Sequence, residues 1–182
     1  MLKVLKSGTD VIWVDPDVVL FKPFTEDIIK RAQGGMAVQW NTPPHFKSPG
    51  KVKLNSGLYY AKSVPWVIGA FKSIVHNGHH HTDSEQMAWD RILCKKSSYE
   101  NGICFFKEHV VFALPRFEYA TGHENSSVTH ALADRISLPQ LKAWHNNWIT
   151  GYDNKIQRAK NMSLFFYNKR IGVCGAVIPD SY

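Results

Sequence analysis

Short apolar blocks of two different periods follow one another along this chain. Residues 11–14 are apolar and mostly β-branched, which predicts a buried strand. Residues 36–40 and 54–61 are also strand-like, the latter with Asn55 and Gly57 inside it, and residues 110–114 predict a further strand. Residues 41–53, which contain three of the prolines, are predicted to form a loop.

Helical spacing is clearest over residues 63–75, where apolar side chains recur at intervals of three and four. Ser63 is the predicted N-cap of this helix, and Gly78 is its predicted end. Further helices are predicted over residues 1–8, from Thr25 to Gly34, from Asp83 onward, over 139–144 and over 152–160. Strands and helices alternate, which is typical of an α/β fold, and the length favours one domain over residues 1–182.

Composition supports a folded protein with a phosphate-carrying partner. The 182 residues are 44% hydrophobic and include 6 Trp, 7 Tyr and 10 Phe, which is enough for one core and for aromatic-lined surfaces. The net charge of +7 suits a nucleotide-sugar, a polyanion or a nucleic acid. Because Lys and Arg are spread along the chain and no nucleic-acid module is visible, we expect no nucleic-acid partner.

The cysteines and glycosylation sequons bear on the compartment. Cys94, Cys104 and Cys174 have no metal-site spacing, so one disulfide with a free thiol and three buried thiols both fit. Asn125 and Asn161 each begin an acceptor sequon, which favours a secretory lumen. No transmembrane stretch or signal peptide is present, so a lumenal enzyme would need an anchor that this chain does not contain.

The most informative motif is Asp15-Pro16-Asp17, directly after the predicted strand 11–14. Pro16 cannot donate to a sheet ladder and therefore ends the strand. Side chains at i and i+2 of an extended chain point the same way, so both carboxylates are expected to converge beyond the strand's carboxyl end. Paired carboxylates suit a divalent cation that carries a substrate's phosphates.

Two other interpretations of this motif stay open. Asp-Pro is a common turn opener that needs no metal. An apolar strand followed by Asp-x-Asp also resembles the nucleophile loop of haloacid dehalogenase-like phosphatases, in which Asp15 would attack phosphate. Those enzymes need a second acidic pair downstream, and the remaining aspartates of this chain form none.

Two further segments hold candidate substrate-binding or catalytic residues. Asn55 has an amide that suits sugar hydroxyls, and Gly57 marks either close approach of a ligand or an ordinary bulge. Asp83 and Gln86 have the spacing of a capping box, which explains their types without a catalytic role. Glu85 has no such explanation and is a candidate for contact with an acceptor hydroxyl.

The segment that begins at His145 can complete a diphosphate site. A neutral imidazole at His145 would add a nitrogen ligand to the two carboxylates, which favours Mn²⁺ over Mg²⁺. Gly151 would let backbone amides approach a phosphate, and Lys155 would neutralise its charge.

Taken together, these motifs resemble the nucleotide-diphospho-sugar transferase family, which includes cell-wall α-xylosyl- and arabinosyltransferases. The matching segments are residues 8–17, 55–60, 85–86 and 145–148. The resemblance implies a GT-A fold, a Rossmann-like α/β sandwich, with Asp15 and Asp17 as the metal motif and His145 as the late metal ligand. It implies a phosphate contact at Lys155 and a catalytic place for Glu85-Gln86, where the family has Asp-Gln.

The same resemblance implies metal-dependent transfer of a sugar from a nucleoside-diphosphate donor to a glycan or glycoprotein, with retention at the anomeric carbon. It also implies a Golgi lumenal enzyme whose membrane contact is made only through an anchor outside this chain. Because much of the family's nucleotide-binding half precedes the Asp-x-Asp strand, the resemblance predicts a domain truncated at its N-terminus. Such truncation leaves a non-catalytic sugar-binding remnant as an alternative.

Overall fold

The computed structural model describes residues 1–41, 52–80, 85–98, 101–123, 127–134, 136–164, 167–168 and 173–174. In this part of the chain, strands and helices form a mixed α/β fold with two principal sheets. The predicted α/β class is therefore confirmed.

The larger sheet contains six strands among the described residues, in the order β1-β4-β3-β7-β6-β5. Their bounds are β1 Val11–Val14, β4 Leu54–Ala61, β3 Met36–Trp40, β7 His109–Leu114, β6 Ile103–Phe106 and β5 Lys96–Ser98. Strands β3 and β7 run parallel, and the other neighbours run antiparallel. The Asp-x-Asp motif follows β1, which lies at the edge of this sheet.

The smaller sheet joins segments that are far apart in the sequence. Within the described residues it has the order β2-β9-β8, with bounds β2 Val18–Leu20, β9 Ala143–His145 and β8 Tyr119–Thr121. Strand β9 pairs antiparallel with β2 and parallel with β8. A short antiparallel pair, β10 (Tyr167–Asn168) with β11 (Val173–Cys174), follows in the chain.

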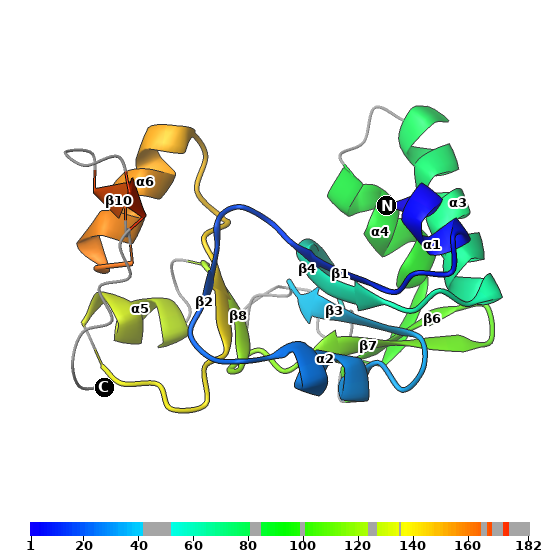
Figure 1. Cartoon of the computed structure of the whole chain (residues 1–182), viewed down its shortest axis with the longest axis horizontal. Coiled ribbons are helices and arrows are strands. Elements are labelled where there is room, and N and C mark those ends of the chain that lie inside the picture. The colour runs from blue at the N-terminus through cyan, green and yellow to red at the C-terminus, as the bar shows by residue number, and fades with distance from the viewer. Residues whose placement is uncertain are drawn as a thin grey trace.

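Helices cover both faces of the larger sheet (Figure 1). On one face lie α1 (Leu2–Lys6), α3 (Pro65–His80) and α4 (Glu85–Leu93), and on the other lies α2 (Thr25–Arg31). Helices α5 (Ser127–Ala133) and α6 (Tyr152–Asn161) lie beside the smaller sheet, at the left of Figure 1. No helix in the described ranges is both long enough and apolar enough to span a bilayer.

Alternation along the strands divides the core into two layers. Met36 and Val38 of β3 belong to the cluster beneath α1, α3 and α4, whereas Ala37 belongs to the cluster beneath α2. Gln39 interrupts this apolar strand and is fully buried. A buried amide must find hydrogen-bond partners inside the protein, and its partners lie at the functional site described below.

An irregularity separates the two halves of β4. The register between β3 and β4 shifts at Val38/Gln39, so three residues of β4, 56–58, have no partner opposite them on β3. Side chains of α4 bind the backbone there: Gln86 accepts from the N–H of Ser56 and donates to the carbonyl of Leu54, and Asp90 accepts from the N–H of Leu54. Gln86 thus binds β4, while its proposed capping partner Asp83 lies outside the described residues.

Cys94 and Cys104 form a disulfide, with Cα atoms 4.7 Å apart, which ties the end of α4 to β6. Of the two arrangements that the sequence left open, the structure therefore has the one with a disulfide and not the one with three buried thiols. Cys174 lies in β11, and its side chain is outside the described part of the structure.

The predicted helix over residues 139–144 is wrong. These residues form a turn followed by the start of β9, a strand that is buried throughout and paired on both sides. The apolar side chains of Leu138, Leu141 and Trp144 have helical spacing, yet they reach one common cluster from a turn and the strand that follows it. Pairing with two neighbouring strands therefore overrides the local pattern.

Both ends of the helix predicted over residues 63–75 differ from the ends observed in the structure. The helix α3 begins at Pro65 and continues through Gly78 to His80. Ser63 does not cap it, because its hydroxyl donates to the carbonyl of Leu5. Beyond the apolar pattern, residues 76–78 continue the helix although they are polar or glycine and exposed or half-buried.

Ionisation of Asp90 should make the free energy of unfolding depend on pH. Burial raises the pKa of this carboxyl to about 6 from an ordinary 3.8, against the opposing effects of the Leu54 N–H and of Lys53. Between these two values the unfolded chain is ionised while the folded chain keeps its proton, so the free energy of unfolding falls as pH rises. The variant Asp90→Asn keeps an acceptor for Leu54 and lacks this term.

We therefore expect the stability of Asp90→Asn relative to wild type to rise by about 3 kcal/mol between pH 4 and pH 6 and to stay level above it. Urea unfolding of both proteins across this range measures the difference, in which the other acidic groups cancel. A difference that does not change with pH would show that the folded Asp90 has an ordinary pKa.

Candidate functional site

The Asp-x-Asp loop meets β9 where the two sheets adjoin. Asp15 follows β1, and its N–H donates to the carbonyl of Gly57 at 2.8 Å. The pairing of Val18 with His145 in the smaller sheet then sets Asp17 beside the end of β9, where the Asp17 carbonyl accepts from the N–H of Asn146 at 2.9 Å. Backbone pairing thus brings the acidic loop to a histidine far away in the sequence.

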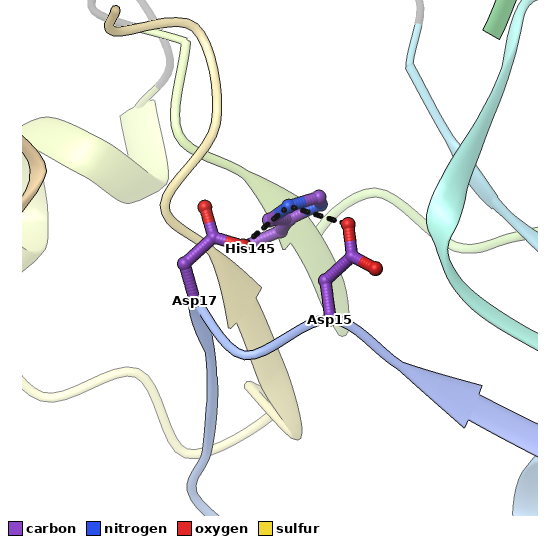
Figure 2. Close-up of side chains that lie close together, drawn as sticks. All are labelled: Asp15, Asp17 and His145. Carbon is purple, nitrogen blue, oxygen red and sulfur yellow. Dashed lines mark ion pairs between the residues drawn. The ribbon is translucent and has the colours of Figure 1, made fainter. Parts of the chain in front are cut away.

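One nitrogen and two oxygens converge at this junction (Figure 2). Nε2 of His145 lies 3.2 Å from Oδ1 of Asp17 and 3.7 Å from Oδ2 of Asp15. All three atoms lie within 4.8 Å of one another, close enough to bind one divalent cation together. The predicted metal group of Asp15, Asp17 and His145 is therefore present as a possible metal-binding group.

Each carboxylate uses its other oxygen for a hydrogen bond within the protein. The indole Nε1–H of Trp13 donates to Oδ1 of Asp15 at 2.7 Å, and the ammonium of Lys155 donates to Oδ2 of Asp17 at 2.7 Å. The oxygens that face His145 are the ones not used in these bonds. Both carboxylates are thus oriented toward a common point.

The ring of His145 is held on two sides. Its Nδ1 lies 3.1 Å from Oε1 of Gln39, and the side chain is almost fully buried. A Cβ atom built on Gly57 would lie 2.1 Å from Cε1 and 2.6 Å from Nδ1 of His145. Gly57 lies in the stretch of β4 that has no partner on β3, and its lack of a side chain makes room for the imidazole.

The electrostatics of the site favour the ionised form of Asp17. Burial would raise the pKa of Asp17, but hydrogen bonds from His145 and Lys155 outweigh it and lower the pKa to about 2. Asp17 is therefore an anion throughout the neutral range. An anion beside a second carboxylate attracts a divalent cation more strongly than either group alone.

Asn41 connects the site to the loop that follows β9. Its Oδ1 accepts from Nδ2 of Asn55 at 3.2 Å, from Nε1 of Trp148 at 3.1 Å and from Nδ2 of Asn147 at 3.5 Å. Asn55 in turn accepts from the N–H of Gly57 at 2.8 Å. The amide predicted to bind sugar hydroxyls is thus already engaged on both of its ends by the protein, and its role toward a substrate stays a prediction.

Arg158 of α6 fixes the same loop. Its guanidinium donates to Oδ1 of Asn146 at 2.6 Å, to the carbonyl of Gly122 at 2.7 Å and to the carbonyl of Asn147. It also lies over the ring of Trp144, 5.3 Å from the centroid. Burial lowers the pKa of this arginine, which a guanidinium tolerates because it remains charged.

The other predicted site residues lie on α4 and at the start of α6. Gly151 precedes α6 with φ of 90°, a conformation that requires glycine and that sets the direction of the helix carrying Lys155. Gln86 contacts the backbone of β4, as described above, and the side chain of Glu85 lies outside the described residues. Roles for Gly151 in phosphate binding and for Glu85 and Gln86 in catalysis stay predictions.

Sequence reasoning missed several residues that hold the site together. Gln39 carried a signal, because it is a polar residue within an apolar strand. Trp13 carried another, since it stands two residues before Asp15 and so shares its side of the extended chain. Asn41 and Arg158 carried none, because their partners come from segments distant in sequence.

Comparison with known proteins places the chain among related sequences. The profile of the nucleotide-diphospho-sugar transferase family matches residues 1–159, which include the whole ligand group. The chain is also similar to a protein named Beta-arabinofuranosyltransferase RAY1 from Arabidopsis thaliana, with 26% identity over 183 residues. This similarity covers 96% of the chain but 34% of the relative, so the chain spans about a third of that protein's length. No solved structure matches the chain significantly.

The fit of His145 against Gly57 can be tested with a single methyl group. The variant Gly57→Ala would force the imidazole away, because the added Cβ cannot coexist with Cε1 at 2.1 Å. Displacement of a ligand by an ångström or more should weaken Mn²⁺ binding by at least about tenfold. Mn²⁺ titration followed by electron paramagnetic resonance measures this loss.

The matched control is Gly69→Ala on α3, where an added Cβ would meet nothing within 4 Å. This variant should bind Mn²⁺ like wild type and be slightly more stable, since alanine favours helices. Equal Mn²⁺ affinities for Gly57→Ala and wild type would mean that the ring does not need its observed place for metal binding.

Proposed function

Because the chain belongs to the nucleotide-diphospho-sugar transferase family, we propose that it is a metal-dependent glycosyltransferase domain. It would move a sugar from a nucleoside-diphosphate sugar to a hydroxyl of a glycan or glycoprotein. The proposal rests above all on the convergence of His145 Nε2 with one oxygen each of Asp15 and Asp17. The haloacid dehalogenase-like alternative is set aside, because the family match is to a transferase and the third member of the group is a histidine.

The donor set fits a divalent cation that binds phosphate oxygens. Two carboxylates supply hard oxygen ligands, and one imidazole favours Mn²⁺ over Mg²⁺. A cation bound by Asp15, Asp17 and His145 would supply Lewis-acid stabilisation of the negative charge on the leaving nucleoside diphosphate. The protein's own contribution is to hold these ligands in place before the donor arrives.

Lys155 would provide a second positive charge for the diphosphate. Its ammonium lies 2.7 Å from Oδ2 of Asp17 and is partly exposed, so it can contact a phosphate beside the metal group. An ammonium that binds the leaving group stabilises charge that develops in the transition state. Lys155 would thereby assist departure of the diphosphate.

In the transfer, the acceptor hydroxyl oxygen bonds to the anomeric carbon while the bond from that carbon to the diphosphate oxygen breaks. The hydroxyl proton can pass to a phosphate oxygen of the leaving group. Retention at the anomeric carbon, Glu85-Gln86 as the catalytic pair, and a GT-A-like arrangement of the domain are further parts of this proposal. Proton resonance spectroscopy of the product's anomeric configuration tests the stereochemistry.

Exposed aromatic side chains on β1, on the loop after β9 and at the start of α6 suit a sugar substrate. Trp13, Trp148 and Tyr152 are 43%, 45% and 77% exposed, and the first two have their indole N–H groups bound to Asp15 and Asn41. Rings held in this way offer apolar faces to a sugar. Because the Arabidopsis relative is named an arabinofuranosyltransferase, a nucleoside-diphosphate arabinofuranose is the first donor to test.

A secretory compartment, in particular the Golgi lumen, is also proposed. The Cys94–Cys104 disulfide favours an oxidising environment. Asn161, which begins the second sequon, is exposed at the end of α6 and is accessible to a glycan.

Binding of uridine diphosphate should depend on both the metal and the two carboxylates. Calorimetric titration of UDP into the protein is expected to give binding with Mn²⁺ and at least about tenfold weaker binding without it. The double variant Asp15→Asn/Asp17→Asn should lose the metal-dependent part, since amides do not replace carboxylates as charged ligands.

Asp153→Asn serves as the matched control, because Asp153 is an exposed acid in the first turn of α6 and not a member of the group. It should bind UDP and Mn²⁺ like wild type. Metal-dependent binding without turnover of any nucleotide-sugar would favour the sugar-binding remnant. UDP binding with the same affinity without Mn²⁺ and in the double variant would contradict the proposed site.

Substitution of Lys155 should weaken binding of UDP but not of Mn²⁺, unlike substitution of the carboxylates. In Lys155→Met, removal of the ammonium leaves Asp17 without its cationic partner, so Mn²⁺ should bind at least as tightly as in wild type. UDP binding in saturating Mn²⁺ should weaken by about tenfold, as expected for loss of a charge-assisted contact. Paired titrations of Mn²⁺ and of UDP check both parts, and unchanged UDP affinity would remove Lys155 from the diphosphate site.

A further inference from the structure

Gln39 is a fully buried amide behind the metal group. It is the penultimate residue of β3, and its side chain reaches from the larger sheet to strands β8 and β9 of the smaller one. Its Oε1 lies 3.1 Å from Nδ1 of His145, and its Nε2 donates to the carbonyl of Ala120 at 2.8 Å and to that of Tyr119 at 3.3 Å. Every polar atom of this side chain is therefore paired.

The two carbonyls fix which way the amide points. Backbone carbonyls accept and cannot donate, so the atom of Gln39 that faces Ala120 and Tyr119 must be the NH₂ group. The atom facing His145 is then the amide oxygen, which can only accept. A hydrogen bond at 3.1 Å consequently requires a proton on Nδ1 of His145.

We propose that Gln39 is a positioning residue that, when a cation is bound, holds His145 in the Nδ1-protonated tautomer, so that the lone pair of Nε2 is free for the cation that Asp15 and Asp17 would also bind. The alternative neutral tautomer would place two acceptors face to face behind the ring and an N–H where a cation must bind. This inference rests on the proposed metal site. The same hydrogen bond also fixes the rotation of the ring on the side away from the carboxylates.

Two substitutions separate this role from a merely structural one. Gln39→Leu fills a similar volume but offers no acceptor to Nδ1 and no donor to the carbonyls of β8. Gln39→Glu keeps an oxygen that can accept from Nδ1 while it loses the amide donors. If the leucine variant does not fold, Gln39→Met takes its place.

The first readout is the protonation pattern of the imidazole. Long-range nitrogen–proton spectra of the ¹⁵N-labelled, Mg²⁺-saturated protein distinguish the two neutral tautomers. The signals of His145 are identified among the nine histidines by their loss in His145→Gln. Wild type and Gln39→Glu should show Nδ1-protonated His145, and Gln39→Leu should show a mixture or the other tautomer.

The second readout is the dissociation constant of Mn²⁺, measured by electron paramagnetic resonance. It should rise by at least about tenfold in Gln39→Leu and by less than about threefold in Gln39→Glu. A leucine variant that matches wild type in both readouts would overturn the proposal, and so would a glutamate variant that falls as far as the leucine variant. Wild-type protein that binds no Mn²⁺ would overturn the metal site itself, and the positioning role with it.

Discussion

The functional site depends on one piece of backbone pairing, the antiparallel contact between β2 and β9. This contact places Val18 opposite His145 and lets the Asp17 carbonyl accept from Asn146. Without it, the Asp-x-Asp loop would be a turn at the edge of the larger sheet, with no third ligand. The pairing is itself stabilised by Trp144, which is fully buried in the cluster that the smaller sheet shares with its helices. Burial of apolar side chains thus determines where the polar ligands meet.

Around the ligands, polar side chains are buried only where they are paired. Gln39 and Asn55 lie in strands of the larger sheet at the point where the β3–β4 register shifts, and both are almost fully buried. Asn55 accepts from the N–H of Gly57 in the stretch that has no partner on β3, while Gln39 and Asn55 fix His145 and Asn41. The irregularity also exposes the backbone of Gly57 to the imidazole. A defect in the regular sheet is therefore what makes room for the site.

The sequence predicted those parts of the site that depend on local pattern or on residue chemistry. Asp15 and Asp17 were identifiable because a β-branched strand precedes them, and Lys155 because it follows His145 and Gly151 within one short polar segment. The strand β9 was mistaken for a helix, because Leu138, Leu141 and Trp144 fit a helical period equally well when their strand partners are unknown. Gly57 makes room for His145, and Asn55 is bound by Asn41. Both contacts join segments distant in the sequence and could not be predicted from spacing.

The charges of the site explain why Lys155 lies where it does. Two carboxylates that point at one place repel each other, and the ammonium of Lys155 on Asp17 and the indole N–H of Trp13 on Asp15 reduce that repulsion. A divalent cation between the carboxylates would supply more positive charge at the same place and would lessen the attraction between Asp17 and Lys155. The ammonium would then be available to a phosphate at the same moment that the cation is. Binding of the metal and readiness for a diphosphate are in this way linked through a single ion pair.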